Sequence, residues 1–236
     1  MNLLLLTPDD CPEPGLARLS GRRLKHVQDV HRAKAGDTLR VGLLGGLTGS
    51  GEILSLSRDE LVLSIRLDTP PPEKLPLTLL LSLPRPKMLK RILQTVSAMG
   101  VSRLVLMNSY RVEKSFWDSP WLDQEVMREQ LILGLEQARD TVLPDVRVEP
   151  LFKPFVEDRL PALVRNTRCY VAHPGAVQHC PVALNQPVTL AIGPEGGFIP
   201  YEVDKLVEAG FEAVHLGPRI LRVETAVAAL VARLFV

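Results

Sequence analysis

The sequence predicts an α/β protein in two parts: a small strand-rich module and a mostly parallel sheet with helices on both faces. The proline-rich stretch Asp68–Pro76 marks the division, because consecutive prolines suit neither helix nor sheet. Before it, short alternating segments are separated by glycine turns. After it, strands and helices alternate over roughly 160 residues, a pattern typical of a parallel sheet. We therefore expect one domain over residues 1–70 and a second over residues 77–236.

In the first part, strands are predicted at Leu39–Leu43, Glu52–Leu56 and Leu61–Leu67, where apolar and polar residues alternate. The glycine cluster Gly42–Gly51 supplies turn material at Gly45-Gly46 and at Gly49-Ser50-Gly51. A phosphate-binding loop is the other interpretation of such a cluster. It lacks Gly-Lys-Ser/Thr and does not open a helix, so a hairpin turn is favoured.

The second part contains a helix from near Pro86 to Gly100, because Pro86 suits a first helical turn and Gly100 a C-terminal cap. The other elements follow from the same kinds of signal. Strands are predicted at Leu77–Leu83, Arg103–Met107, Val146–Val148, Arg168–Ala172, Val188–Ile192 and Ala213–Leu216, and further helices at Leu122–Val142, Tyr201–Ala209 and Val223–Phe235.

Composition excludes several classes of protein. The chain has 236 residues, 46% of them hydrophobic, with 28 basic and 27 acidic residues and a net charge of +1. It can bury a core, and it is neither disordered as a whole nor a histone-like polycation. Its 3 cysteines form no CxxC pair and its 5 histidines show no metal-ligand spacing, so we expect no metal. No apolar run suits a signal peptide or a membrane span, and the protein is expected in the cytoplasm.

Two glycine-bearing segments carry the functional signal. In Ile192–Phe198 (Ile-Gly-Pro-Glu-Gly-Gly-Phe) an apolar strand ends in a loop whose backbone can be approached closely. In Leu216–Ala226 (Leu-Gly-Pro-Arg-Ile-Leu-Arg-Val-Glu-Thr-Ala) a second strand runs through a Gly-Pro loop into an apolar helix. Each alone could be an ordinary strand–helix turn. Together, at the carboxyl ends of parallel strands, they predict a crevice for a small ligand.

These two segments resemble the signature of the ribosomal RNA small subunit methyltransferase E family, which belongs to the SPOUT class. The resemblance covers the whole chain and includes His26–Arg40 near the N-terminus. It implies a PUA-like, RNA-binding β-barrel over residues 1–70 and a SPOUT methyltransferase domain over residues 77–236 with a C-terminal trefoil knot. It further implies a homodimer that uses S-adenosylmethionine to methylate N3 of one uridine in the 16S rRNA of the small ribosomal subunit.

The same resemblance assigns the cofactor site. Contacts would come mainly from backbone groups, with Leu216, Ile220 and Leu221 as apolar walls and with Ala172 and His173 completing the pocket. The cofactor-binding residues would be Ala172, His173, Ile192, Gly193, Pro194, Glu195, Gly196, Gly197, Leu216, Gly217, Ile220, Leu221 and Arg222.

The chemistry suggests three catalytic residues. Uridine N3 is a poor nucleophile until its proton leaves, so a cation such as Arg222 would favour the uracil anion. Glu224 or Glu195 could accept the proton directly or through water. The alternatives are that Arg222 and Glu224 brace the knot, and that Glu195 accepts backbone N–H groups within its own loop.

Basic residues gather in two stretches, Gly15–Ala35 and Arg85–Arg111, and the second contains no acidic residue. Such patches suit RNA phosphates, although basic runs also occur as solvated helix faces. The predicted RNA contacts are Arg22, Arg23, Lys25, Arg85, Lys87, Lys90, Arg91 and Arg111.

Some positions depart from the family pattern. The family usually has Thr where this chain has Val223, and Lys and Glu where it has Thr95 and Ala98. In Glu136–Asp140 the Glu-Gln pair is kept, but the Arg that usually follows it is displaced. These departures indicate a divergent branch and bear on RNA contacts more than on the cofactor. Two other functions therefore stay open: a SPOUT methyltransferase acting on tRNA or large-subunit rRNA, and a non-catalytic RNA-binding assembly factor.

Overall fold

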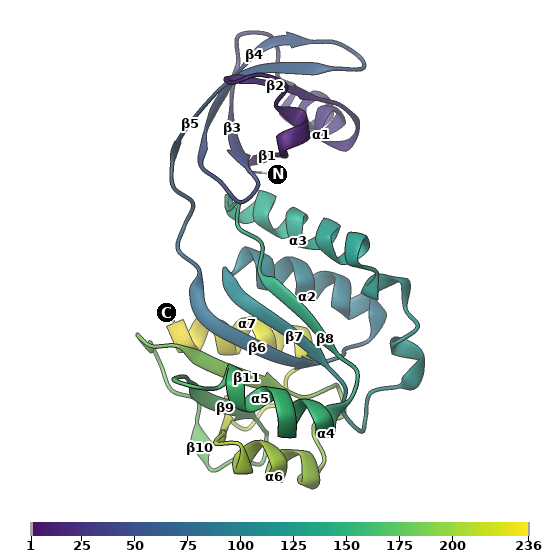
Figure 1. The fold of residues 1–236 in the computed structure, drawn as a ribbon, viewed down its shortest axis with the longest axis vertical. Coiled ribbons are helices and arrows are strands. Elements are labelled where there is room, and N and C mark those ends of the chain that lie inside the picture. Colours follow the sequence, from purple (N-terminus) through teal and green to yellow (C-terminus); the bar gives the residue numbers. More distant parts are fainter. Residues whose placement is uncertain (1, 236) are drawn as a thin grey trace. The chain divides into compact units, whose positions relative to one another are not determined.

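A computed structural model of the chain describes residues 2–235 (Figure 1). Its contacts divide the chain into two compact units, which are considered separately. The first contains residues up to Glu73 together with Leu131–Leu143, and the second contains Lys74–Gln130 and the residues from Pro144 onward. The first unit thus includes a segment, Leu131–Leu143, that the sequence places in the second domain. The apolar side chain of Leu135 accounts for this, because it is buried with Leu3 and Leu5.

The first unit is built on a curled, mixed sheet. Its strands are β1 (Leu4–Leu6), β2 (Leu16–Leu19), β3 (Thr38–Leu43), β4 (Thr48–Leu56) and β5 (Leu61–Thr69). They are ordered β1-β3-β4-β5-β2, with β1 parallel to β3 and the remaining pairs antiparallel. β1 and β2 are the two edges of this sheet, so it is a half-barrel rather than the closed barrel implied by the resemblance.

A short helical segment, α1 (Gly21–His26) with the following turn Val27–His31, buries Leu24 and Val27 against this sheet.

One turn prediction in this unit is wrong. Gly49, Ser50 and Gly51 lie within β4, where they pair with Val41, Arg40 and Leu39 of β3. The glycines are needed for close packing rather than for a turn. A Cβ atom at Gly49 would collide with the backbone carbonyl of Arg66, at an irregularity in the β4–β5 register. Gly45, with a φ of +73°, makes the actual turn.

The second unit contains the predicted parallel sheet. Its seven strands are β6 (Leu75–Ser82), β7 (Val101–Met107), β8 (Asp145–Glu149), β9 (Arg168–Ala172), β10 (Gln178–His179), β11 (Val188–Ile192) and β12 (Glu212–His215). The order is β10-β12-β9-β11-β6-β7-β8, and every pairing is parallel. β10 and β8 are therefore the edge strands, and β9, β11 and β6 are central.

Helices cover both faces of this sheet (Figure 1). On one face lie α4 (Phe152–Pro154), the turn Phe155–Arg159, α5 (Leu160–Leu163) and α6 (Pro200–Glu208), which share a core with Leu80, Val105 and Ala191. On the other face α2 (Pro86–Ala98) packs against α7 (Val223–Phe235). No helix among residues 2–235 is long and apolar enough to cross a membrane.

The long helix α3 (Gln124–Ala138) is shorter than the predicted Leu122–Val142. It ends because Arg139 adopts a left-handed conformation, with a φ of +62°. The side chain of Asp140 then accepts the backbone N–H groups of Thr141 and Val142, at 2.6 and 3.0 Å. These bonds replace the helical ones, so the chain turns at this point.

Candidate functional site

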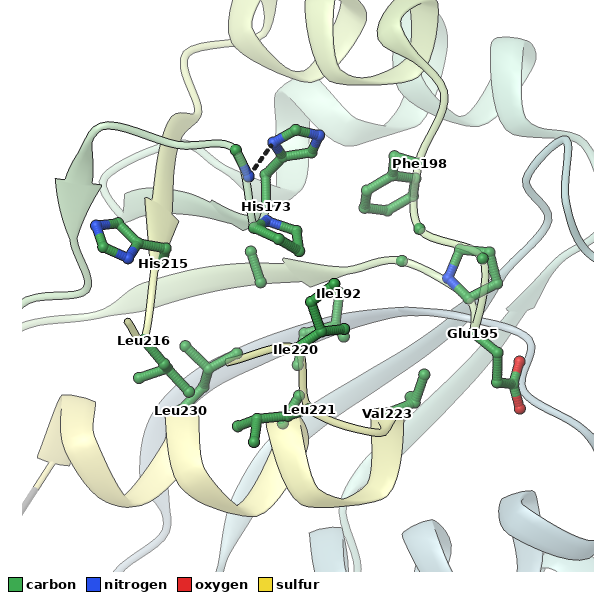
Figure 2. A pocket seen from close by; sticks show the side chains of 18 of the residues that line it. His173, Ile192, Glu195, Phe198, His215, Leu216, Ile220, Leu221, Val223 and Leu230 are labelled. Carbon is green, nitrogen blue, oxygen red and sulfur yellow. Dashed lines mark hydrogen bonds between the residues drawn. The ribbon is translucent and has the colours of Figure 1, made fainter. Parts of the chain in front are cut away.

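A cavity of about 370 Å³ lies at the carboxyl edge of three adjacent strands, β12, β9 and β11 (Figure 2). Because these strands are parallel, the loops that follow them all leave the sheet at the same edge. These loops are residues 173–175, 193–198 and 216–222. The N-terminal half of α7 supplies a further wall.

The loop after β11 is folded tightly on itself. The N–H group of Gly197 donates to the carbonyl of Pro194 at 2.7 Å. A Cβ atom at Gly193 would lie 2.9 Å from the backbone nitrogen of Phe198, so only glycine fits there without a shift. Phe198 is buried behind the loop and fixes its far end. The backbone of residues 193–197 is thereby exposed to the cavity.

A buried carboxylate secures the end of this loop. Glu202, which is 2% exposed in the first turn of α6, accepts the N–H group of Ile199 at 3.0 Å. Its second oxygen accepts the N–H group of Tyr110 at 2.7 Å, in the loop that follows β7. The loops after β7 and β11 are therefore tied together by one side chain.

Two histidines at the ends of β9 and β12 make the same bond to the loop that follows each strand. His173 Nδ1 accepts the N–H group of Gly175 at 3.1 Å, and His215 Nδ1 accepts that of Gly217 at 3.0 Å. Each bond holds its ring against the backbone of that loop. Gly217 has a φ of +119°, a conformation open to glycine but not to other residues. The His215 ring also lies 4.2 Å from that of His179.

The walls of the cavity are largely apolar. Figure 2 shows Ile192, Leu216, Ile220 and Leu230 surrounding the space from the strands, the loop after β12 and α7. Ile220 is 82% exposed, which is unusual for a large aliphatic side chain at the rim of a cavity. An apolar slot with a few backbone and imidazole groups suits a flat, partly polar small molecule.

The charged side chains among the described lining residues, Arg111, Glu195 and Arg219, are all exposed to solvent. Arg111 and Arg219 line the cavity, and the guanidinium of Arg111 donates to the carbonyl of Gly196. Glu195 is the only carboxylate among the described lining residues. It does not bond within its own loop. Its Oε1 accepts the backbone N–H group of Arg85 at 3.1 Å, and Figure 2 shows the carboxylate pointing away from the cavity.

The structure brings nearly all the residues assigned to the cofactor together. Those that line the cavity are Ala172, His173, Ile192, Gly193, Pro194, Glu195, Gly196, Gly197, Leu216, Gly217, Ile220 and Leu221. Arg222 and Glu224, at the start of α7, are not among its lining residues, although Val223 between them is. The carbonyl of Arg222 accepts the N–H group of Ala226 at 2.8 Å and so begins the helix.

Several lining residues were not assigned from the sequence. Val223, Ala226 and Leu230 lie at helical spacing on one face of α7. Because most residues of this helix are apolar, the sequence does not distinguish this face from the others. Val214 and His215 belong to the predicted strand Ala213–Leu216, whose following loop carries the glycine signal. Arg219 lies within the predicted loop and could have been chosen as a cation beside Arg222.

The predicted RNA contacts fall into two groups. In the first unit, Arg22 forms two hydrogen bonds of 2.9 Å with Glu136, and Arg23 forms two with Asp10 at 2.6 and 2.7 Å. Both guanidinium groups thus brace the fold of this unit. Lys25 is exposed on α1.

In the second unit, Arg85, Lys87, Lys90 and Arg91 form an exposed row at the start of α2. The Lys90 ammonium lies 5.3 Å over the ring of Trp121, and Arg111 is among the residues that line the cavity. Among residues 2–235, no group of three or more His, Cys, Asp or Glu side chains is arranged to hold a metal ion.

Known proteins share both the sequence and the fold. Residues 71–235 match the family of RNA methyltransferase domains, and the chain belongs to this class. A ribosomal RNA small subunit methyltransferase E of Treponema pallidum is 32% identical over 97% of this chain and 88% of that protein. One of Mycobacterium bovis is 26% identical over 97% of this chain and 89% of that protein. The chain is therefore a member of the ribosomal RNA small subunit methyltransferase E family, as the two glycine-bearing segments predicted.

A solved structure shows the same fold. The enzyme of this name from Neisseria gonorrhoeae, bound to S-adenosyl methionine, superposes with a TM-score of 0.74 at 22% identity. The match covers 98% of this chain and 95% of that one. The α/β architecture with its parallel sheet is thus shared along the whole chain.

Proposed function

We propose that this protein transfers a methyl group from S-adenosylmethionine to N3 of one uridine in the 16S rRNA of the small ribosomal subunit. One observation carries the proposal: two glycine-bearing loops of an RNA methyltransferase family member enclose a single cavity of about 370 Å³. The family relatives are named for small-subunit rRNA, and the Neisseria structure holds this cofactor.

The cavity residues fit that cofactor. Its adenine ring needs an apolar slot with backbone hydrogen-bonding groups, which Ile192, Leu216 and Ile220 and the exposed loop backbones supply. A Cβ atom at Gly193 would clash with the backbone of Gly197 and Phe198, so glycine is needed for the tight fold of the loop that lines the cavity. When bound, the cofactor supplies a methyl group on a positively charged sulfur, which needs no further activation.

The protein must then prepare the uridine. The imide N3 reacts as an anion, so nearby positive charge raises the reactive fraction. Arg222 is our candidate for this role, and Arg111 and Arg219, which line the cavity, add positive charge. Glu224, which also lies at the start of α7, is our candidate to take up the N3 proton directly or through water. A stacked target base would have to be flipped out of the RNA first.

Affinity for RNA would come from the exposed row on α2, whose cations suit phosphate oxygens, and from Lys25 on α1. With such a substrate, we expect the protein in the cytoplasm.

A homodimer and a trefoil knot also belong to the proposal by resemblance. Cys180 N–H donates to the His215 carbonyl at 2.9 Å, and Leu184 N–H to the Leu234 carbonyl at 2.6 Å. Residues 180–184 are thus bonded both to the end of β12 and to the end of α7. Light scattering at several protein concentrations would test the dimer.

The decisive experiment is mass spectrometry of nucleosides from rRNA of cells lacking this protein. The proposal expects the loss of one N3-methyluridine from 16S rRNA and its return with the wild-type gene. Loss of a modification from tRNA or large-subunit rRNA would identify a different target, and no loss at all would favour a non-catalytic assembly factor. Arg222→Ala should lower turnover at least about a hundredfold if the guanidinium stabilises the anion. Turnover within a few-fold of wild type would remove Arg222 from the mechanism.

A further inference from the structure

The bond between Glu195 and Arg85 joins two parts of the second unit that are 110 residues apart in the chain. Glu195 lies in the loop after β11 that lines the cavity. Arg85 is the residue before α2, and its N–H group is one of the donors that a helix start leaves without a helical partner. The first turn of α2 contains no acidic residue, so Glu195 supplies the negative charge that a helix N-terminus favours.

This bond has consequences at both ends. On one side, the same α2 carries the exposed row Arg85, Lys87, Lys90 and Arg91. On the other side, Glu195 lies between Pro194 and Gly196, whose backbone lines the cavity. The bond therefore links the start of α2 to one wall of the cavity.

The same geometry argues against proton transfer by Glu195. One carboxylate oxygen is engaged with the N–H group of Arg85, and Figure 2 shows the group directed away from the apolar walls where a reacting base would meet the cofactor. A proton acceptor must reach the atom that it deprotonates within hydrogen-bond distance.

We propose that Glu195 is a positioning residue that couples RNA binding at the start of α2 to cofactor binding in the cavity. This inference rests on the proposed function. Because coupling between two sites is reciprocal, RNA should tighten cofactor binding by the same factor as the cofactor tightens RNA binding. Glu195 acts as an acceptor for a backbone N–H group, so a neutral side-chain oxygen in the same place should largely replace it.

The first test is calorimetry with S-adenosylmethionine and the full-length protein, alone and with 30S subunits from cells lacking the protein. If the wild-type protein binds no cofactor with or without subunits, the proposed function itself fails, and this result is distinct from a failure of the role proposed for Glu195. If it binds, Glu195→Ala should weaken the affinity for the cofactor about fivefold. In this variant, 30S subunits should no longer tighten cofactor binding. Glu195→Gln should stay within about threefold of the wild type in cofactor affinity and in kcat. A large loss of kcat in Glu195→Gln with unchanged affinity would overturn the proposal and make Glu195 a proton acceptor.

A second pair of variants tests the bond from its other end. Arg85 has a φ of −52°, which proline can adopt, so Arg85→Pro removes the N–H donor without straining φ. Arg85→Ala is the matched control, because it removes the same side chain and keeps the donor. In Arg85→Pro, 30S subunits should no longer tighten cofactor binding, whereas in Arg85→Ala they still should. Adding Glu195→Ala to Arg85→Pro should lower cofactor affinity little further. Full additivity of the two substitutions would overturn the proposal, and thermal unfolding of each variant would exclude a general loss of fold.

Discussion

Gly193→Ala should damage the cavity out of proportion to the single methyl group that it adds. The new Cβ atom would lie 2.9 Å from the backbone nitrogen of Phe198 and 3.2 Å from the carbonyl carbon of Gly197. Ordinary contact begins at 3.4 Å, so the backbone must move by about 0.5 Å. Phe198 is buried in the core and cannot move freely, so the cavity side of the loop has to yield.

Overpacking of this kind costs about 1–3 kcal/mol. If the cost falls on the loop that holds the cofactor, the affinity for S-adenosylmethionine should drop about tenfold or more, since 1.4 kcal/mol corresponds to a factor of ten. Calorimetry would measure the affinity, and urea unfolding the stability.

Gly196→Ala is the matched control within the same loop. Its Cβ atom would meet the flexible side chain of Arg111 at 2.9 Å instead of backbone, and that side chain can swing aside. Its effect should stay below about threefold, because side-chain rearrangement is cheaper than backbone displacement. Wild-type affinity in Gly193→Ala, or equal damage in both variants, would refute this reasoning.

Other predictions concern stability, thiol reactivity and RNA binding. Burial alone would raise the pKa of Asp10, but its hydrogen bonds and charge interaction with Arg23 outweigh burial and hold the pKa below its usual value. Ionised Asp10 therefore stabilises the fold above about pH 4. Asp10→Asn should lower the free energy of unfolding in urea by about 1–3 kcal/mol at pH 7, and this loss should shrink as the pH falls through the folded pKa of Asp10. A loss that stays constant with pH would contradict this. Burial raises the pKa of the Cys180 thiol to about 11. A thiol reagent at pH 8 should therefore label Cys180 only after the protein is unfolded. Rapid labelling of the native protein, detected by mass spectrometry, would argue against the burial of this thiol. Replacing Lys87 and Arg91 together by alanine should reduce the salt dependence of RNA binding by about 1.5 in the log–log slope, and an unchanged slope would show that they touch no phosphate.

The sequence predicted the parallel sheet well because its signals are local. Strands β9 and β11 and helix α7 begin and end at the predicted residues, since apolar runs bounded by proline, glycine and charged residues leave little choice. Interactions between distant residues caused the errors. Gly49 lies in a strand where the neighbouring strand leaves no room for a Cβ atom, and α3 ends early because Asp140 accepts the following N–H groups.

The candidate site shows the same division. Glycine-bearing loops after apolar strands could be recognised in the sequence, and they line one cavity. The bonding of individual charged groups could not be recognised. Arg22 appeared as part of a basic patch, yet its partner Glu136 lies 114 residues away, and Glu195 bonds to a residue 110 positions earlier. Only the three-dimensional structure identifies such partners.

The two edges of the seven-stranded sheet also restrict how this unit can associate with other chains. The edge strand β10 contains only Gln178 and His179, and the opposite edge, β8, carries Asp145, Arg147 and Glu149. Short or charged edges discourage the addition of a foreign strand, which is the usual route to aggregation of exposed sheets. A second copy of this unit would therefore dock through helices and loops, and amyloid-like growth from the folded sheet is disfavoured.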